Sequence, residues 1–196
     1  MSDIKYNRID EDLQQKIISN RESHWVNPYA FKDEMAVRRN NDIDKANLWR
    51  PVFVRDIEKI MHLPYYNRYA DKTQVFSFKN NDDITRRAQH VQLVSRIARN
   101  IGSVLGLNLD LIEAIALGHD LGHTPFGHSG EAILNVICED GFTHYEQSVR
   151  VVEKLEKNGK GLNLTWEVRD GIRNHRTAGH PSTLEGGVVR LSDKIA

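Results

Sequence analysis

The sequence predicts an all-α protein, a bundle of helices without a central sheet. After Asp83, apolar residues recur at the spacing of amphipathic helices, and no series of alternating strands interrupts them. In addition, the apolar run at 111–117 leads directly into His119 and Asp120, with further histidines and a glutamate close behind. A buried helix that ends in so many ionisable groups needs something to compensate them. A metal ion is the simplest compensation, because imidazole and carboxylate are both metal ligands.

Composition places the chain among ordinary globular proteins. Its 196 residues suit one domain with a real core, and 39% of them are hydrophobic and 28% charged. Lys+Arg and Asp+Glu balance at 27 each, which gives no strong nucleic-acid signal, and no apolar stretch predicts a membrane span. The single cysteine, Cys138, excludes an intrachain disulfide and is expected in the core. One unpaired cysteine fits a reducing compartment, so we expect a cytoplasmic location.

The first half of the chain divides into an arm and the start of the main domain. Residues 1–50 are expected to form an N-terminal arm that is partly irregular, with one helix at 10–20 capped by Asp10. A helix at 55–61 should stop before the next proline. The alternating stretch 73–78 favours a short strand or an extended loop.

The second half is predicted to be helical throughout. Asp83 or Thr85 should cap the first of these helices and Asp110 the second, while Trp166 is expected in the core. The expected helices span 83–101, 110–120, 129–139, 145–157, 165–175 and a last segment opened by the capping box at 182–185. Because the last helix has no stop signal, we expect 51–196 to be a domain that is truncated at its C-terminal end.

Four residues on three of these helices can converge on one ion. His90 lies on the first helix after Asp83, His119 and Asp120 on the next, and Asp193 on the last. Each alone would more often be a satisfied polar group of the core, but the joint pattern favours a metal site. Two nitrogens and two oxygens suit one divalent ion, either Mn, Mg, Fe, Co, Ni or Zn, with positions left for water and substrate.

These residues also carry a family resemblance. The order H…HD…D is similar to that of the HD-domain metal-dependent phosphohydrolases, and HDLGHTPFGHSGE resembles the deoxynucleoside triphosphate triphosphohydrolase, or dGTPase-like, branch. RYADKTQVF, TRRAQHVQLVSRIAR, GFTHYEQSVRVVEKL, GIRNH and STLEGGVVRLSDKIA resemble the same branch, so the resemblance covers about 55–196. It implies a helical HD-domain bundle around a single metal site, and an enzyme that splits a dNTP into deoxynucleoside and inorganic triphosphate. It also implies a homo-oligomer.

The resemblance assigns roles residue by residue. The metal ligands would be His90, His119, Asp120 and Asp193. His128 and Glu131 match a His–acid pair that acts on the attacking water or the leaving group, and His123 matches a phosphate-contacting histidine. The residues expected to bind substrate are Arg87, Lys72, Gln74, Arg68 and His144. The chain departs from the family at Asn67, where an arginine is usual, and at Tyr145, where an asparagine is usual.

Other functions remain open at this stage. The nearest alternative is another HD-type nucleotide phosphohydrolase, such as a nucleotidase or a phosphodiesterase. His119 and His123 also stand at the i, i+4 spacing of zinc peptidases, but Gly122 and Pro125 break the helix and Asp replaces the catalytic Glu. A catalytically impaired nucleotide-binding protein is disfavoured because all four expected ligands are present.

Overall fold

The computed structural model describes residues 10–41, 44–72 and 83–196, and these ranges are built from helices with no β-strand. The prediction of an all-α fold is therefore confirmed. Both the stretch expected to be extended, 73–78, and Gln74 within it lie outside the described residues. No helix in the described ranges is long and apolar enough to cross a membrane.

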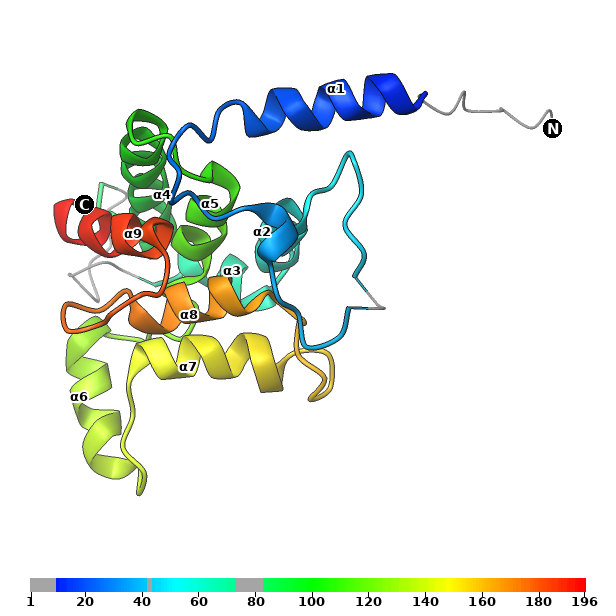
Figure 1. The fold of residues 1–196 in the computed structure, drawn as a ribbon. Coiled ribbons are helices and arrows are strands. Elements are labelled where there is room, and N and C mark those ends of the chain that lie inside the picture. The colour runs from blue at the N-terminus through cyan, green and yellow to red at the C-terminus, as the bar shows by residue number, and fades with distance from the viewer. Residues whose placement is uncertain (1–9, 42–43, 73–82) are drawn as a thin grey trace.

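The arm begins with α1 (Glu11–Glu22), which lies along the outside of the bundle and buries none of its residues (Figure 1). The carboxylate of Asp10 accepts a hydrogen bond from the Leu13 backbone N–H at 2.7 Å, so the predicted N-cap is confirmed. The rest of the arm is irregular apart from the 3₁₀ turn η1 (Asp33–Met35). Arg38 nevertheless anchors it to the bundle, because its buried guanidinium forms an ion pair with Asp56 at 2.6 Å.

The first helix of the bundle, α2 (Val52–Met61), is strongly amphipathic and begins three residues before the predicted start. It ends as expected near the following proline. That proline opens the short helix α3 (Pro64–Asn67), which continues into the 3₁₀ turn η2 (Arg68–Ala70). The buried face of α2 contributes Phe53 and Ile60, which are fully buried in the core.

The centre of the bundle is α5 (Leu109–Gly118). It packs against α2, α4 (Arg87–Val104), α8 (Trp166–Asn174) and α9 (Leu184–Ile195). Both predicted caps are wrong. The cap position of α4 is held by Arg86, without a side-chain cap bond, and the N-cap of α5 is Asn108 rather than Asp110. The side-chain oxygen of Asn108 accepts backbone N–H bonds at the start of α5, so the helix begins earlier than predicted.

Four elements lie between the His–Asp pair and α9, and of these α8 packs against α5. They are α6 (Gly127–Ile137), α7 (His144–Arg150), the π-helical turn η3 (Val151–Leu155) and α8 (Trp166–Asn174). In Figure 1, α6 extends beyond the end of the bundle, and none of its residues is buried. Cys138, just after α6, is consequently exposed, so its predicted place in the core is wrong.

Two details of the last helices also differ from the predictions. Trp166 at the start of α8 is 46% exposed, because the inward face of α8 is formed by Val168 and Ile172 instead. The helix α9 (Leu184–Ile195) is capped by Thr183, whose hydroxyl accepts the Gly186 N–H, and not by the predicted capping box. The carboxylate of Glu185 is buried and accepts the backbone N–H groups of Phe31 and Asn108, at 2.9 and 3.1 Å.

Candidate metal centre and cavity

The three helices expected to supply metal ligands converge at one point. His90 comes from α4, His119 directly follows α5, and Asp193 comes from α9. An oxygen of Asp193 lies 3.1 Å from Nε2 of His90 and 3.6 Å from Nε2 of His119. Asp120 joins them, with an oxygen 3.5 Å from Nε2 of His119. The structure therefore brings together all four residues predicted to bind the metal.

The donor atoms of this cluster suit a divalent ion. Nδ1 of His119 donates to the carbonyl oxygen of Ala116 at 2.7 Å, which turns Nε2 toward Asp120 and Asp193. This Nε2 is buried and has no hydrogen-bond partner among the residues that the structure describes. A buried polar atom without a partner is costly, and a ring whose other nitrogen is held by a carbonyl is the usual form of a metal-binding histidine. Ligand atoms of His90, His119 and Asp120 all lie close enough together to hold one ion.

The histidine and the carboxylates of this cluster shift one another's pKa values. Although burial opposes protonation, the carboxylates of Asp120 and Asp193 raise the pKa of His119 to about 9. Burial works against ionisation of Asp120 as well, but His119 and Arg87 hold the pKa of that carboxyl well below its usual range. The carboxylates are thus ionised at neutral pH, as metal ligands must be.

Arg87 has a different partner from the predicted triphosphate. Its guanidinium donates to Asp120 at 2.6 Å, and both side chains are buried. Arg87 still lines the cavity beside the cluster, so the ion pair places it between the metal ligands and the space that a substrate would fill. One arginine can bridge a carboxylate and a phosphate because its guanidinium carries five N–H donors.

A second group of side chains lies next to the ligands and centres on Glu131. Its carboxylate accepts from the ring of His144 at 2.9 Å and lies 3.3 Å from Nδ1 of His128. The side chain of His128 is 82% exposed, whereas that of His144 is largely buried. The structure thus places Glu131 beside His128, as the predicted His–acid pair requires. The shorter contact of Glu131, however, is the one with His144. Hydrogen bonds from His144 outweigh the effect of burial and lower the pKa of Glu131.

His123 lies between the two groups. It is buried, and its ring centroid is 5.2 Å from that of His144. Within the described ranges, its Nε2 has no hydrogen-bond partner. Burial lowers the pKa of His123 to about 4, so the ring is neutral at pH 7. A neutral imidazole with a free nitrogen on a cavity wall can accept or donate one hydrogen bond to a bound ligand.

His175, which directly follows α8, is a further residue of the site that was not predicted from the sequence. It is buried, donates from Nδ1 to the carbonyl of Ile172 at 2.7 Å, and its Nε2 lies 3.1 Å from Nε2 of His144. Its ring centroid is 4.9 Å from that of His119, so it connects the two groups. The only signal was its place in GIRNH, a stretch that resembles the family without indicating a role.

A cavity of about 580 Å³ opens over both groups. Its lining includes Arg87, His90, Asp120, His123, His128, His144, His175, Arg176 and Asp193. Arg176 was not predicted either; its guanidinium lies 4.7 Å from the ring of Tyr145, where the family usually has asparagine. A cavity lined by cations, histidines and ionised carboxylates is suited to a metal-bound anion.

Two of the predicted substrate-binding residues lie away from this cavity. Lys72 is half-buried and donates to the carbonyl of His123 at 2.6 Å, and burial lowers its pKa. Arg68 is exposed and lies over the ring of Tyr65 at 4.7 Å. Neither lines the cavity. Lys72 supports the loop that holds His123, whereas Arg68 does not reach the ligand cluster.

Comparison with known proteins agrees with this geometry. The sequence profile described as "HD domain" matches residues 87–196, which contain all four candidate ligands. The chain belongs to the HD-domain family. This HD-domain chain is 52% identical, over 98% of its length and 54% of the relative's, to a deoxyguanosinetriphosphate triphosphohydrolase-like protein of Caldanaerobacter subterraneus subsp. tengcongensis. Proteins with the same name from Clostridium perfringens and Clostridium tetani are 48% and 43% identical, over 91% and 96% of this chain. The chain spans about half the length of these relatives.

Proposed function

We propose that this HD-domain chain hydrolyses deoxynucleoside triphosphates to deoxynucleoside and inorganic triphosphate, using one divalent metal ion. The observation that carries the proposal is the convergence of His90, His119, Asp120 and Asp193 beside a cavity lined by cations and histidines. The names of the relatives support the choice of substrate, since they are called deoxyguanosinetriphosphate triphosphohydrolase-like. Manganese or magnesium is the expected ion.

His90, His119, Asp120 and Asp193 would hold the ion, which supplies Lewis-acid polarisation of a phosphate and stabilises the charge that develops in the transition state. Arg87 is placed to bind phosphate oxygens on the cavity side of its ion pair with Asp120. Neutral His123 lines the same cavity, and in the tautomer that carries its proton on Nε2 it is placed to donate to the phosphate chain.

Proton transfer falls to the group around Glu131. Water attacks the α-phosphorus and the bond to the 5′-oxygen breaks, so one proton must leave the water and one must reach the leaving oxygen. His128 is exposed to the cavity and lies 3.3 Å from an ionised carboxylate, which suits it for transferring a proton. Glu131 also orients His144, which supports the same wall.

A panel of the four dNTPs with Mn²⁺ or Mg²⁺, analysed for both products, tests this function. Deoxynucleoside and intact triphosphate should appear in equal amounts, and neither should appear in the Asp120→Ala variant. A nucleotidase would instead release orthophosphate from a monophosphate, and a phosphodiesterase would open a cyclic or dinucleotide substrate. Release of orthophosphate or pyrophosphate from dNTPs, or no turnover by folded and metal-loaded protein, contradicts the proposal.

We further propose that the chain assembles into a homo-oligomer. The exposed face of α6 supports this, because Ile133, Val136 and Ile137 are all more than half exposed there and α6 buries no residue. Sedimentation at several protein concentrations should show a species larger than 22.5 kDa. A sedimentation coefficient that stays at the monomer value up to high concentration would contradict an oligomer.

A further inference from the structure

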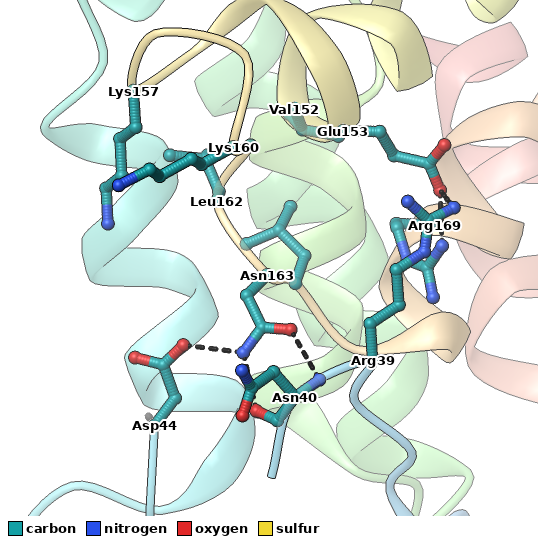
Figure 2. A pocket seen from close by; sticks show the side chains of 12 residues that line it. Arg39, Asn40, Asp44, Val152, Glu153, Lys157, Lys160, Leu162, Asn163 and Arg169 are labelled. Carbon is teal, nitrogen blue, oxygen red and sulfur yellow. Dashed lines mark hydrogen bonds and ion pairs between the residues drawn. The ribbon is translucent and has the colours of Figure 1, made fainter. Parts of the chain in front are cut away.

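A second cavity lies outside the group of histidines and carboxylates, where the loop after η3 meets the arm (Figure 2). It has a volume of about 420 Å³ and shares no lining residue with the first cavity. Its lining contains four cations, Arg39, Lys157, Lys160 and Arg169, but only two acids. Val152, Leu162 and Leu164 contribute apolar side chains. The proposed hydrolysis makes no use of this cavity.

Both acids of the lining are already neutralised. Glu153 forms ion pairs with Arg39 at 3.1 Å and with Arg169, as Figure 2 shows. Asp44 accepts from Lys59 and from the side chain of Asn163, both at 2.8 Å. These hydrogen bonds outweigh the opposing effect of burial and lower the pKa of Asp44 to about 2. Neither carboxylate is left to neutralise a further cation.

The two lysines are the unpaired charges. Neither ammonium group has an ion pair or a hydrogen bond within the part of the chain that the structure describes. Figure 2 shows the side chains of Lys157 and Lys160 extending to the same side of the loop, toward one another. Glu156, next to Lys157 in sequence, pairs with neither. Two like charges that approach each other without an acid between them repel, and a bound anion removes that repulsion.

The loop that presents the lysines is held in a defined shape. Lys157 and Asn158 both have a left-handed backbone, with φ of 49° and 55°, which non-glycine residues rarely adopt. Gly161 packs so closely on η3 that a Cβ there would lie 2.3 Å from the Glu153 carbonyl oxygen. The backbone N–H of Leu162 then donates to the carbonyl of Val152 at 2.7 Å. The fold therefore sets the backbone positions of the two lysines, whose side chains are exposed.

We propose that this second cavity binds a small phosphate-bearing anion, with Lys157 and Lys160 holding the phosphate oxygens. Ammonium groups are compact point charges that suit phosphate, and two of them match a group with several anionic oxygens. The apolar residues of the lining, Val152, Leu162 and Leu164, are buried and form the floor of the cavity. The anion is therefore either free phosphate or diphosphate, or the phosphate of a nucleotide, and both share the same contact to the lysines.

Titration with inorganic diphosphate, followed by ³¹P NMR at low ionic strength with a metal chelator present, tests the site separately from the metal-dependent one. The Lys157→Ala/Lys160→Ala variant should bind roughly tenfold more weakly per lysine removed, as expected for hydrogen bonds to charged groups. Parallel titrations with dAMP and deoxyadenosine identify the source. If dAMP binds more tightly than the inorganic anion, the ligand is a nucleotide. If the inorganic anion binds more tightly than dAMP, the ligand is the free anion.

Two further variants make the test specific. Lys16→Ala/Lys32→Ala removes the same charge from exposed positions outside the cavity and should bind diphosphate like the wild type. Glu153→Gln removes a negative charge from the lining and should tighten binding. The proposal is overturned if the wild type does not bind diphosphate, or if the two double-lysine variants weaken binding equally. Dichroism spectra of each variant establish that it is folded, and neither result depends on the proposed hydrolysis.

Discussion

Nε2 of His175 lies 3.1 Å from Nε2 of His144, and this contact defines which protons the two rings carry. His175 already donates from Nδ1 to a backbone carbonyl, and burial lowers its pKa to about 4, so its Nε2 is an acceptor at neutral pH. His144 must then donate from Nε2. Its Nδ1 faces the ionised carboxylate of Glu131 at 2.9 Å. Both nitrogens of the His144 ring thus face acceptors, and His175 is the acceptor for Nε2.

Removing the His175 acceptor should therefore change His144. In His175→Ala we expect the Nε2 proton of His144 to lose its partner, and turnover to fall roughly 10- to 100-fold, the effect typical of a lost supporting hydrogen bond at a metal site. His175→Gln should retain more activity, since its amide oxygen can accept the same bond. The ¹⁵N shifts of His144 report the change directly. If they are identical in wild type and His175→Ala, the proton assignment is wrong.

The metal prediction follows from the shared position of Asp193 between two histidines. Asp193→Asn removes a charge that faces both His90 and His119, so bound Mn²⁺ should fall to a trace while the fold persists. Adding Mn²⁺ to the wild type should raise its melting temperature, because the ion binds only the folded chain. The variant should show no such rise. Elemental analysis after gel filtration measures the metal, and Asp140→Asn, an exposed site, serves as the control.

The order and type of α2, α4, α5, α8 and α9 could be predicted from sequence, because each has an apolar face long enough to show its period. The four-residue α3 is too short to show one. The ends could not, since several short polar side chains near each end compete for the cap. Asn108 prevails over Asp110 at α5 because Asn108 is also tied to the arm, through bonds from its amide to Phe31 and Asp33. Glu185 likewise binds the arm and not its own helix start. Contacts of this kind join residues that are distant in sequence.

The candidate metal ligands could be predicted because the pattern H…HD…D places them on three helices at once. His175 could not, since a single histidine after a helix has no spacing relation to the others. For Glu131, the sequence predicts only the contact with His128, which lies three residues earlier on the same helix. The turn between α6 and α7 brings His144 to the same carboxylate at a shorter distance. Whether these residues act as assigned stays a prediction.

Glu131 contacts two histidines, so its removal should cost more than loss of one pair. His128→Ala should keep its metal and lower turnover by about 10²–10⁴-fold, as for a lost general acid–base group. If Glu131 served only His128, adding Glu131→Gln would cost little more. Because Glu131 also holds His144, we expect a further decrease in the double variant. Turnover numbers for the two single variants and the double variant decide this. If the double variant turns over as fast as His128→Ala, Glu131 acts only through His128. Loss of metal in His128→Ala would make His128 a ligand.

The stability of the arm should depend on pH through Asp33. Burial raises the pKa of this carboxyl from 3.8 to about 6, although a hydrogen bond from Asn108 opposes the shift. Between these two values the folded chain binds more protons than the unfolded chain. The free energy of unfolding therefore falls as pH rises from about 4 to about 6. The stabilisation that the protonated Asp33 carboxyl contributes is complete below pH 3.8 and is lost above about pH 6.

Asp33→Asn removes this dependence, because the amide is neutral at every pH and its oxygen can still accept from Asn108. At pH 7 we expect the free energy of unfolding of the variant to be about 1–2 kcal/mol higher than that of the wild type. At pH 4 the two should be equal. Urea denaturation at pH 4, 5, 6 and 7 measures the difference, with Asp140→Asn as the exposed control. A variant that is less stable than the wild type at pH 7 would mean that the ionised carboxylate stabilises the arm, and that burial does not dominate its pKa.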